Sequence, residues 1–556
     1  MSRKAWLLVI VAVLAMGTLV VCGAGVAVWG YRTMISGRQM AAPTQYAPEQ
    51  PPLAASSGEL RVVGSMPPTL DPALVQDSTS GSYVVHLFSG LVALNADLEV
   101  VPALAEGWEA SPDGRTFTFL LRAEAAFGDG KPIKAADVVG SIERALSPEL
   151  RSPVALSYLG DIVGAEAFAR GQVTHIAGLE ALDDRTVQIT IDSPKSYFLA
   201  KLTYPTAAVV DLEQIAREPQ TWFLDPNPSG PFWLKEISRS TIVLVRNGHY
   251  VVRPASIARV TYDLTPGLPI TQYETGEIDI TEFGGAEIDR VQDPYNPLHD
   301  EYLGQPELSV QYIGLNVTAP PFDDPLVRRA FAYAIDRDKL AELVLNRTAL
   351  AANTILPPSM PGFAPVTPET APAYDPVEAR RLLAASTYGS AGKLPPIALT
   401  VPGTSAQLGA IDRAVLAMIE ESLGIKMTVE QVEWADMLND MNQRRFQAYS
   451  AGWIADYPDP QNFIDVQFHS GSTQNHTGYA SAEVDALLEQ ARIEQDVEQR
   501  MALYQRAELV ILNDAPWIPL THGYAYYLVK PYIQGFQGTA ALYPWLCDIT
   551  IIDQGK

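Results

Sequence analysis

Cysteine, histidine and positive charge are all scarce in this chain of 556 residues. The two cysteines, Cys22 and Cys547, lie near opposite ends and cannot form a disulfide framework. The seven histidines show no metal-ligand spacing, so we expect neither a metal nor another cofactor. Lys and Arg number 39 against 64 Asp and Glu, and the resulting net charge of −25 repels phosphate backbones. The composition therefore argues against a nucleic-acid partner.

Sequence motifs of catalysis are missing as well. The chain has no Gly-x-Ser-x-Gly elbow, no His-Glu-x-x-His and no Gly-x-Gly-x-x-Gly after a predicted strand. Residues 388–393 superficially resemble a phosphate loop, but Leu394 stands where a Ser or Thr should bind magnesium. In so acidic a chain, neighbours such as Asp323 and Asp324 are typical of helix caps or solvated surface. We therefore predict that the protein is not an enzyme.

The N-terminal segment carries the longest run without charge. Ala5 to Gly30 contains no charged residue, and Arg3 with Lys4 precedes it. About 20 apolar residues cross a bilayer as a helix, so this run is long enough to span one. A secretory signal would be shorter and would end in a small-residue cleavage site, which is not evident here. We predict an uncleaved membrane anchor, with a cleaved signal peptide as the alternative.

Residues 1–58 contain two further features. Cys22 follows Leu-Val-Val and matches a bacterial lipoprotein box only in part, because Val21 stands where a small residue is required. Lipidation of Cys22 is thus an alternative to a plain membrane-embedded thiol. Residues 41–57 are rich in Pro, Ala and Ser and indicate a linker. The rest of the chain keeps 35 basic residues against 63 acidic ones, so the acidity belongs to the folded part.

From Glu59 onward, strand and helix signals alternate. Runs rich in β-branched and aromatic residues predict strands, and Asp-Pro pairs at 324–325 and 375–376 predict helix starts, with a carboxylate cap before a proline. The helices would cover residues 326–335 and 379–385. The predicted strands are 59–64, 116–121, 186–191 and 257–262. This pattern favours an α/β or α+β fold with several sheets.

A series of short motifs occurs in the order found in one protein family. The chain resembles the solute-binding proteins of ABC importers for oligopeptides and dipeptides, known as family 5, over most of the body. Each motif is weak alone, whereas the ordered series is strong. The segments that carry the resemblance are 70–72 (LDP), 86–91 (HLFSGL), 102–108 (PALAEGW), 111–119 (SPDGRTFTF), 127–138 (FGDGKPIKAADV), 273–279 (YETGEID), 314–316 (GLN), 321–331 (PFDDPLVRRAF) and 423–425 (LGI).

The resemblance implies a bilobed clamshell of the periplasmic-binding-protein type. Two crossing hinge strands would join the lobes, an extra subdomain would be inserted into the first lobe, and the ligand would be buried between the lobes. By analogy, lobe I comprises residues 59–100, 227–308 and 524–556. The inserted subdomain covers 101–226, and lobe II covers 309–523. Such a receptor closes on its solute by hinge motion and hands it to a permease.

The residues that match the family's peptide site lie mainly in one segment, 452–463. In the resembling proteins the aspartate of Trp-x-x-Asp pairs with the ligand's α-amino group, and here that residue is Asp456. A local alternative is that Asp456 caps a turn, although Asp459 before Pro460 is the better cap candidate. Truncating one partner of a buried charge pair typically loses about 2–5 kcal/mol, so a carboxylate is a strong anchor for an enclosed ammonium.

Further site residues follow from the same resemblance. Trp434 and Trp453 match tryptophans that wall the side-chain pockets, with ordinary core packing as the alternative for Trp434. Backbone groups of Gly452 and Ile454 would bond an extended ligand like an added strand. Asn316 and Tyr83 match segments that border the cleft.

One departure from the family leaves the ligand open. Some members carry an arginine three residues before the second tryptophan to meet a ligand carboxylate, and here Ser450 stands there. Arg444 or Arg445 could substitute. A sugar, an opine or a metal chelate is therefore an alternative to a peptide, since the fold serves all of them.

Three functional hypotheses follow. The first is an extracytoplasmic, membrane-anchored, monomeric binding protein, periplasmic or at the cell surface, that delivers peptides to an ABC permease. The second is a peptide-sensing receptor that signals without transport. A weaker third is a hydrolase with Asp456 and Asp459 as paired acids.

Overall fold

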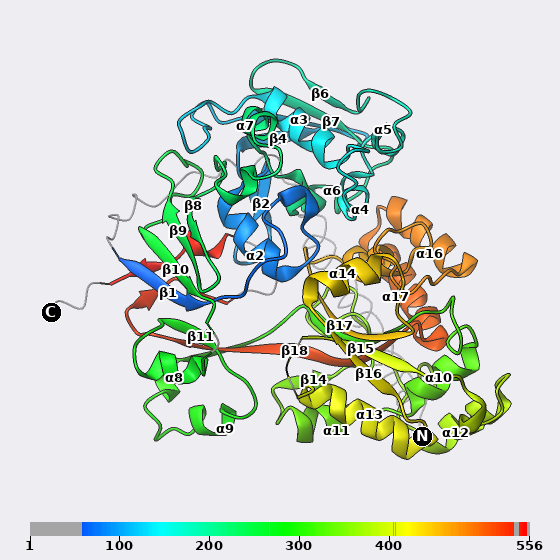
Figure 1. Cartoon of the computed structure of the whole chain (residues 1–556). Helices are drawn as coiled ribbons and strands as arrows, with labels where there is room; N and C mark the ends of the chain where they lie inside the picture. Colours follow the sequence, from blue (N-terminus) through cyan, green and yellow to red (C-terminus); the bar gives the residue numbers. More distant parts are fainter. Residues whose placement is uncertain (1–57, 266, 404, 406, 539–543, 553–556) are drawn as a thin grey trace, which may run out of the picture. The chain divides into compact units, whose positions relative to one another are not determined.

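The computed structural model describes residues 58–265, 267–403, 405, 407–538 and 544–552, and its elements are labelled as in Figure 1. The predicted membrane anchor at 5–30, Cys22 and the linker lie outside the described residues. Within the described ranges, no helix is long and apolar enough to cross a membrane.

The largest sheet has twelve strands and contains elements from widely separated parts of the chain. Strand β1 pairs in parallel with β10 and β11, while β9 and β8 continue the sheet beyond β10 in antiparallel fashion. The order along the sheet is β16 (Thr428–Val432), β15 (Ala398–Pro402), β17 (Ala448–Ile454), β13 (Ser309–Leu315), β18 (Trp517–Val529), β11 (Ile280–Glu282), β1 (Glu59–Val63), β10 (Arg259–Asp263), β9 (Thr241–Arg246) and β8 (Phe232–Ile237).

Strand β18 links the two halves of this sheet. Its first half pairs with β13 and with β14 (Ala349–Ala351), and its second half pairs with β11 and with β12 (Tyr302–Pro306). Strands β12 and β13 follow each other in the chain, so the chain passes between the halves twice, in opposite directions. Figure 1 shows β18 as the long red arrow between β11 and β14. These are the two crossing strands that the family resemblance implies.

A separate sheet of four strands lies between β3 and β8 in the chain. Its order is β4 (Ala105–Ala110), β5 (Thr116–Leu121), β7 (Thr186–Thr190) and β6 (Leu179–Ala181), all antiparallel. Two-stranded pairings are formed by β2 (Val92–Leu94) with β3 (Val100–Pro102), and by β19 (Ile533–Gln534) with β20 (Thr550–Ile551). Sheets and helices alternate along the chain, so the predicted α/β class is confirmed.

Helices begin where the sequence predicts caps. The Asp324 carboxylate accepts a hydrogen bond from the N–H of Leu326 at 2.8 Å, and Asp375 accepts from the N–H groups of Val377 and Glu378 at 2.9 Å. The described helices are α2 (Ser78–Leu87), α3 (Ala135–Ala145), α4 (Ala155–Leu159), α5 (Ala165–Ala169), α6 (Phe198–Lys201), α7 (Leu212–Arg217), α8 (Pro269–Glu274), α9 (Ile288–Val291), α10 (Pro325–Tyr333), α11 (Arg337–Lys339), α12 (Pro376–Ala385), α13 (Ala410–Leu423), α14 (Trp434–Asn442), α15 (Asp465–Phe468), α16 (Ala482–Ile493) and α17 (Val497–Asp514).

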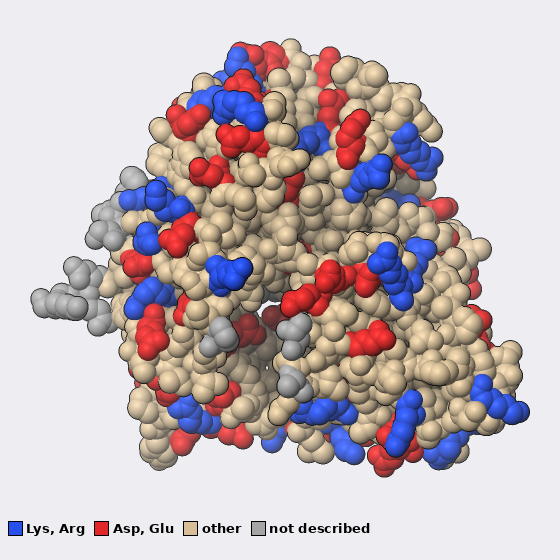
Figure 2. All heavy atoms as spheres, in the orientation of Figure 1, with Lys and Arg blue, Asp and Glu red and all other residues tan. Residues whose placement is uncertain are grey.

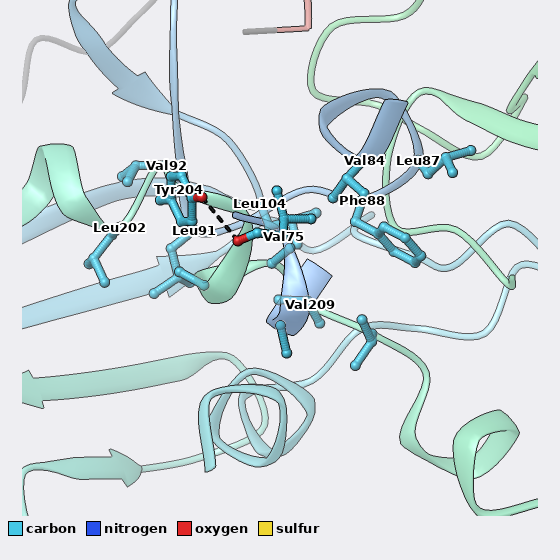
Figure 3. Close-up of a cluster of buried hydrophobic side chains, with 14 of the residues drawn as sticks. Val75, Val84, Leu87, Phe88, Leu91, Val92, Leu104, Leu202, Tyr204 and Val209 are labelled. Carbon is cyan, nitrogen blue, oxygen red and sulfur yellow. Dashed lines mark hydrogen bonds between the residues drawn. The ribbon is translucent and has the colours of Figure 1, made fainter. Parts of the chain in front are cut away.

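The apolar side chains form several buried clusters rather than one core. One cluster joins β1, α2 and the four-stranded sheet, and two more cover the sheet half that contains β13, β15 and β17. Figure 3 shows part of the first cluster, in which the hydroxyl of Tyr204 donates to the carbonyl of Val75 at 3.0 Å. This bond fixes the aromatic ring of Tyr204 beside the segment that leads into α2.

Candidate ligand-binding site

A cavity lies beside β17 and α14. It encloses about 660 Å³ of empty space, part of which is open to solvent. One wall comes from the segment before α2 and from Tyr204, and the other from β13, α14, β17 and the loop before α16. The lining residues are Gln76, Asp77, Ser78, Tyr204, Tyr312, Trp434, Leu438, Met441, Ala451, Gly452, Trp453, Ile454, Asp456, Gln474 and His476.

The carboxylate of Asp456 is held by its own chain segment. The side-chain amide of Asn462 donates to Oδ2 of Asp456 at 2.8 Å, and the N–H of Asp456 donates back to Oδ1 of Asn462 at 3.0 Å. Asn462 ends a short 3-10 helix, Pro460–Asn462, whose cap is Asp459, since Asp459 accepts from the N–H of Gln461 at 3.0 Å. Because Asp459 does the capping, the carboxylate of Asp456 is available to the cavity.

A tyrosine from a distant segment also reaches this carboxylate. The hydroxyl of Tyr158, on α4, donates to Oδ2 of Asp456 across 298 positions of sequence. The ring of Tyr158 stacks on the ring of Tyr204 with centroids 3.6 Å apart and planes 1° from parallel. Stacking on Tyr204, which lines the cavity, therefore positions the Tyr158 hydroxyl that donates to Asp456.

Burial dominates the electrostatics of Asp456. The residue is only 8% exposed, and burial raises the pKa of its carboxyl group to about 6, while the bonds from Tyr158 and Asn462 act in the opposite direction. A carboxylate taken out of water is costly unless a cation meets it. Both bonds from the protein end on Oδ2, so this carboxyl group can accept a further donor from a ligand.

The two tryptophans lie in the apolar wall of the cavity. Trp434, Leu438 and Met441 follow at intervals of four and three residues and share one face of α14. Trp453, on β17, donates from Nε1 to Oδ1 of Asn462 at 3.2 Å. Both tryptophans are half-buried, so each contacts the core and also presents ring surface to the cavity.

The backbone of β17 has an open edge at the cavity. Ala455 donates its N–H to Leu308 and Gln447 accepts from Asn316, so odd-numbered residues of this strand direct their backbone groups toward the β13 side. Gly452 and Ile454 consequently direct theirs to the opposite side. On that side the pairing with β15 ends at Tyr449 in the described chain. The N–H and C=O groups of Gly452 and Ile454 can thus pair with an extended ligand.

Two of the expected site residues do not line the cavity. Asn316 is buried, and its amide donates to the carbonyls of Arg444 and Phe446, both at 3.0 Å. Tyr83 is buried in α2, where its hydroxyl donates to the carbonyl of Ser65 at 2.9 Å. Both side chains use their polar atoms to fix neighbouring backbone, so they support the walls without facing the cavity.

The basic residues considered as carboxylate partners also lie elsewhere. Arg444 donates to the carbonyl of Asn475 at 3.0 and 3.1 Å, and Arg445 pairs with Asp440 at 2.8 Å. Asp459 forms a two-pronged pair with Arg500, at 2.8 and 2.9 Å. Asp459 does not line the cavity, so the paired acids of the hydrolase hypothesis are not assembled there.

Sequence reasoning missed several lining or supporting residues. Tyr158, Tyr204 and Asp77 come from the N-terminal part of the chain, and no local pattern connects them with the segment around Asp456. Asn462 lies within the same aromatic and acidic segment as Asp456, so the sequence alone offers it as a partner of that carboxylate. Gln474 and His476 lie in a polar stretch without a distinctive motif.

Comparison with known proteins shows which family the chain belongs to. Residues 99–475 match the sequence profile of the bacterial extracellular solute-binding proteins, family 5 Middle. The chain belongs to this family.

Relatives in the family cover nearly the whole chain. The probable deoxycholate-binding periplasmic protein YgiS of Escherichia coli K12 is 32% identical over 85% of this chain and 89% of its own length. The periplasmic oligopeptide-binding protein OppA of the same organism is 29% identical over 87% of this chain and 91% of its own. Family members are binding proteins, and those named periplasmic are extracytoplasmic.

Solved structures of the family confirm the clamshell fold. The murein tripeptide binding protein MppA of Escherichia coli superimposes with a TM-score of 0.81 at 27% identity, covering 90% of this chain and all of that one. The unliganded open form of MppA gives a TM-score of 0.62, with 90% of this chain and 98% of that chain covered. The described body is thus more similar to the first of these structures than to the open form.

Proposed function

We propose that this protein captures peptides by their free amino end and delivers them unchanged to an ABC permease. The observation that supports the proposal most is the buried carboxylate of Asp456, held by Tyr158 and Asn462 at the wall of a cavity. The ammonium group of an enclosed ligand would be a cationic partner for this buried carboxylate. We expect the ligand to be returned intact, because Asp459, the second acid of the hydrolase hypothesis, is not among the described residues that line the cavity with Asp456.

The peptide backbone would lie along β17. The open edge at Gly452 and Ile454 offers main-chain partners, and Trp434 and Trp453 offer broad apolar surface to the side chains. Recognition through backbone groups reads the direction and the amino end of a peptide and leaves its side chains largely free. This mode suits a receptor for several peptides.

We also propose that the domain boundaries lie at residues 100, 226, 308 and 523. The passages from β12 to β13 and along the middle of β18 support the boundaries at 308 and 523. The four-stranded sheet between residues 105 and 190 supports a separate subdomain at 101–226. Lobe I would then contain α2 and β1, and lobe II would contain the cavity wall formed by α14 and β17.

The N-terminal sequence supports a proposal for the location of the receptor. Residues 5–30 would anchor the protein in the membrane, and residues 41–57 would hold the body near its permease. Mass spectrometry of the mature N-terminus tests this part of the proposal. A terminus that retains residues 1–30 supports the anchor, whereas cleavage before residue 58, or a lipid on Cys22, contradicts it.

Thermal unfolding of the full chain with peptides tests the ligand class. Saturating tri-alanine should raise the unfolding midpoint, since ligand at about 100 times Kd stabilises the folded state by roughly 2.7 kcal/mol. N-acetyl tri-alanine should give no shift, because it lacks the ammonium group. Asp456→Asn should abolish the shift, while Asp459→Asn should keep it. A shift with deoxycholate and none with any free-amine peptide would refute the peptide assignment.

A further inference from the structure

A second carboxylate lines the same cavity. Asp77 precedes α2 and is 8% exposed. Its Oδ1 accepts a hydrogen bond from the N–H of Ser80 at 2.9 Å, and its carbonyl accepts from the N–H of Gly81 at 3.0 Å. Its Oδ2 is buried and has no hydrogen-bond partner among the described residues.

Capping of α2 accounts for only one of the two carboxylate oxygens of Asp77. An N-cap needs one acceptor oxygen, which Oδ1 of Asp77 supplies, and an Asn or Ser would cap about as well. A buried acceptor without a partner costs about 1–3 kcal/mol. Asp77 lines the cavity that contains Asp456, so a donor group on a ligand can supply the missing bond to Oδ2.

The two carboxylates act on a common neighbour. Burial is the main reason why the pKa of Tyr204 is raised, and the charges of Asp456 and Asp77 both add to the shift. The Tyr204 hydroxyl is tied to the carbonyl of Val75, two residues before Asp77, as Figure 3 shows. Asp77 and Asp456 therefore place two negative charges around one phenol, from two distant chain segments.

Among the described lining residues there is no Lys or Arg to balance these charges. His476 is the one histidine among them, and burial lowers its pKa to about 4, so it is neutral near pH 7. Arg444, whose charge acts on the lining residue His476, is bonded to the carbonyl of Asn475 and does not line the cavity. Figure 2 shows further carboxylates gathered over α14, which forms part of the wall. One of them on this helix, Asp440, pairs with Arg445, which does not line the cavity. The site is therefore built for positive charge beyond a single ammonium.

We propose that the preferred ligand carries two cationic groups close together, as in a peptide whose N-terminal residue is Lys or Arg. Asp456 takes the α-ammonium, which rests on the proposed function, and Oδ2 of Asp77 takes the second cation. Diamines carry the same chemistry and are the other source of such a ligand. Anionic steroids such as deoxycholate are disfavoured, although one of the relatives is named for binding it.

Titration calorimetry of the full chain distinguishes these ligands. The probes are tri-alanine, Lys-Ala-Ala, Ala-Ala-Lys, cadaverine and deoxycholate, at a salt concentration of about 0.15 M to screen the general attraction of an acidic protein. We expect Lys-Ala-Ala to bind at least about tenfold tighter than tri-alanine, a difference that needs only about 1.4 kcal/mol. Ala-Ala-Lys should gain less, because its lysine is not next to the free amino end.

Asp77→Asn keeps a capping oxygen and removes the charge. It should bring the affinities of Lys-Ala-Ala and tri-alanine close to each other. The matched control is Asp375→Asn, which removes the charge of another helix cap outside the cavity and should leave the ratio of the two affinities as in the wild type.

The outcomes separate this inference from the proposed function. Equal wild-type affinities for Lys-Ala-Ala and tri-alanine, or a preference that survives in Asp77→Asn, would overturn the second cation site and leave the role of Asp456 standing. The wild-type comparison decides this even if Asp77→Asn does not fold. If cadaverine binds tightly and none of the peptides binds, the result would refute the peptide function and support a site for two cationic groups. Binding of deoxycholate alone would overturn both.

Discussion

The carboxyl group of Asp456 has to be ionised to hold an ammonium group. Burial raises its pKa to about 6 in the unliganded protein, so near pH 5 most molecules carry a proton there. Because this pKa is higher in the folded protein than in the unfolded chain, the folded state binds the proton more tightly. The free energy of unfolding therefore increases through Asp456 as pH falls from about 6 toward 4. Ligand binding becomes weaker over the same range.

Ligand binding should release this proton. We expect the affinity for tri-alanine to be about tenfold weaker at pH 5 than at pH 7, and calorimetry in buffers of different ionisation enthalpy should detect up to about one proton released at the lower pH. The reason is that only the ionised carboxylate pairs with the ligand. Asp456→Asn should show no proton release. A wild-type affinity that stays constant over this range would contradict the assignment.

At the residue scale, the sequence predicted some of the site and missed the rest for a physical reason. Asp456, Trp434, Trp453, Gly452 and Ile454 follow from the family resemblance, which depends on motifs within short segments, and all five line the cavity. The hydroxyl of Tyr158 and the bare oxygen of Asp77 matter only because distant segments meet. The separation of 298 positions between Tyr158 and Asp456 leaves no periodicity or spacing to detect.

Single elements follow from local signals, except at their ends. Strand β5 spans Thr116–Leu121 as predicted, and β7 ends at Thr190, one residue earlier than predicted. Strand β10 begins at Arg259, two residues later than predicted, where its pairing with Glu59 of β1 and Val245 of β9 also begins. Partner strands determine such ends, and the sequence of one strand does not contain them.

The cap of α12 offers a stability prediction at this scale. The carboxylate of Asp375 accepts from two N–H groups at 2.9 Å, and Pro376 follows in the first turn. We expect Asp375→Ala to lower the free energy of unfolding by about 1 kcal/mol, because both N–H groups lose their acceptor. Urea unfolding measures the change. Asp375→Asn keeps the acceptor and should change stability much less, so equal losses in the two variants would contradict the capping role.

For the whole molecule, the order of the family motifs predicted two lobes joined by two crossing strands, which no single helix or strand signal predicts. The two passages of chain along β12–β13 and β18 join the sheet halves, as the family resemblance implied. Contacts between the inserted region and the region around the cavity were not predictable, since they are single side-chain bonds. Ser157 bonds Thr473 at 3.1 Å, and the amide of Gln495 donates to the carbonyl of Pro194 at 3.1 Å.

These bonds join the inserted region to the region around the cavity, so they should favour this arrangement over a more open one without selecting the ligand. Ser157, Thr473 and Gln495 are separate from the lining of the ligand cavity, so their loss should shift the balance between open and closed forms for every ligand alike. Two hydrogen bonds of ordinary net strength contribute about 1–3 kcal/mol, so Ser157→Ala combined with Gln495→Ala should weaken binding roughly tenfold.

The ratio of affinities for two peptides distinguishes closure from recognition. In the double variant, Lys-Ala-Ala and tri-alanine should both bind more weakly by the same factor, because closure precedes or accompanies capture of either one. Asn513→Ala is the matched control, since its amide donates to the carbonyl of Thr370 at 2.8 Å within the region assigned to lobe II. It should leave both affinities unchanged. A double variant that weakens only one of the peptides would show that these bonds act on recognition rather than on closure.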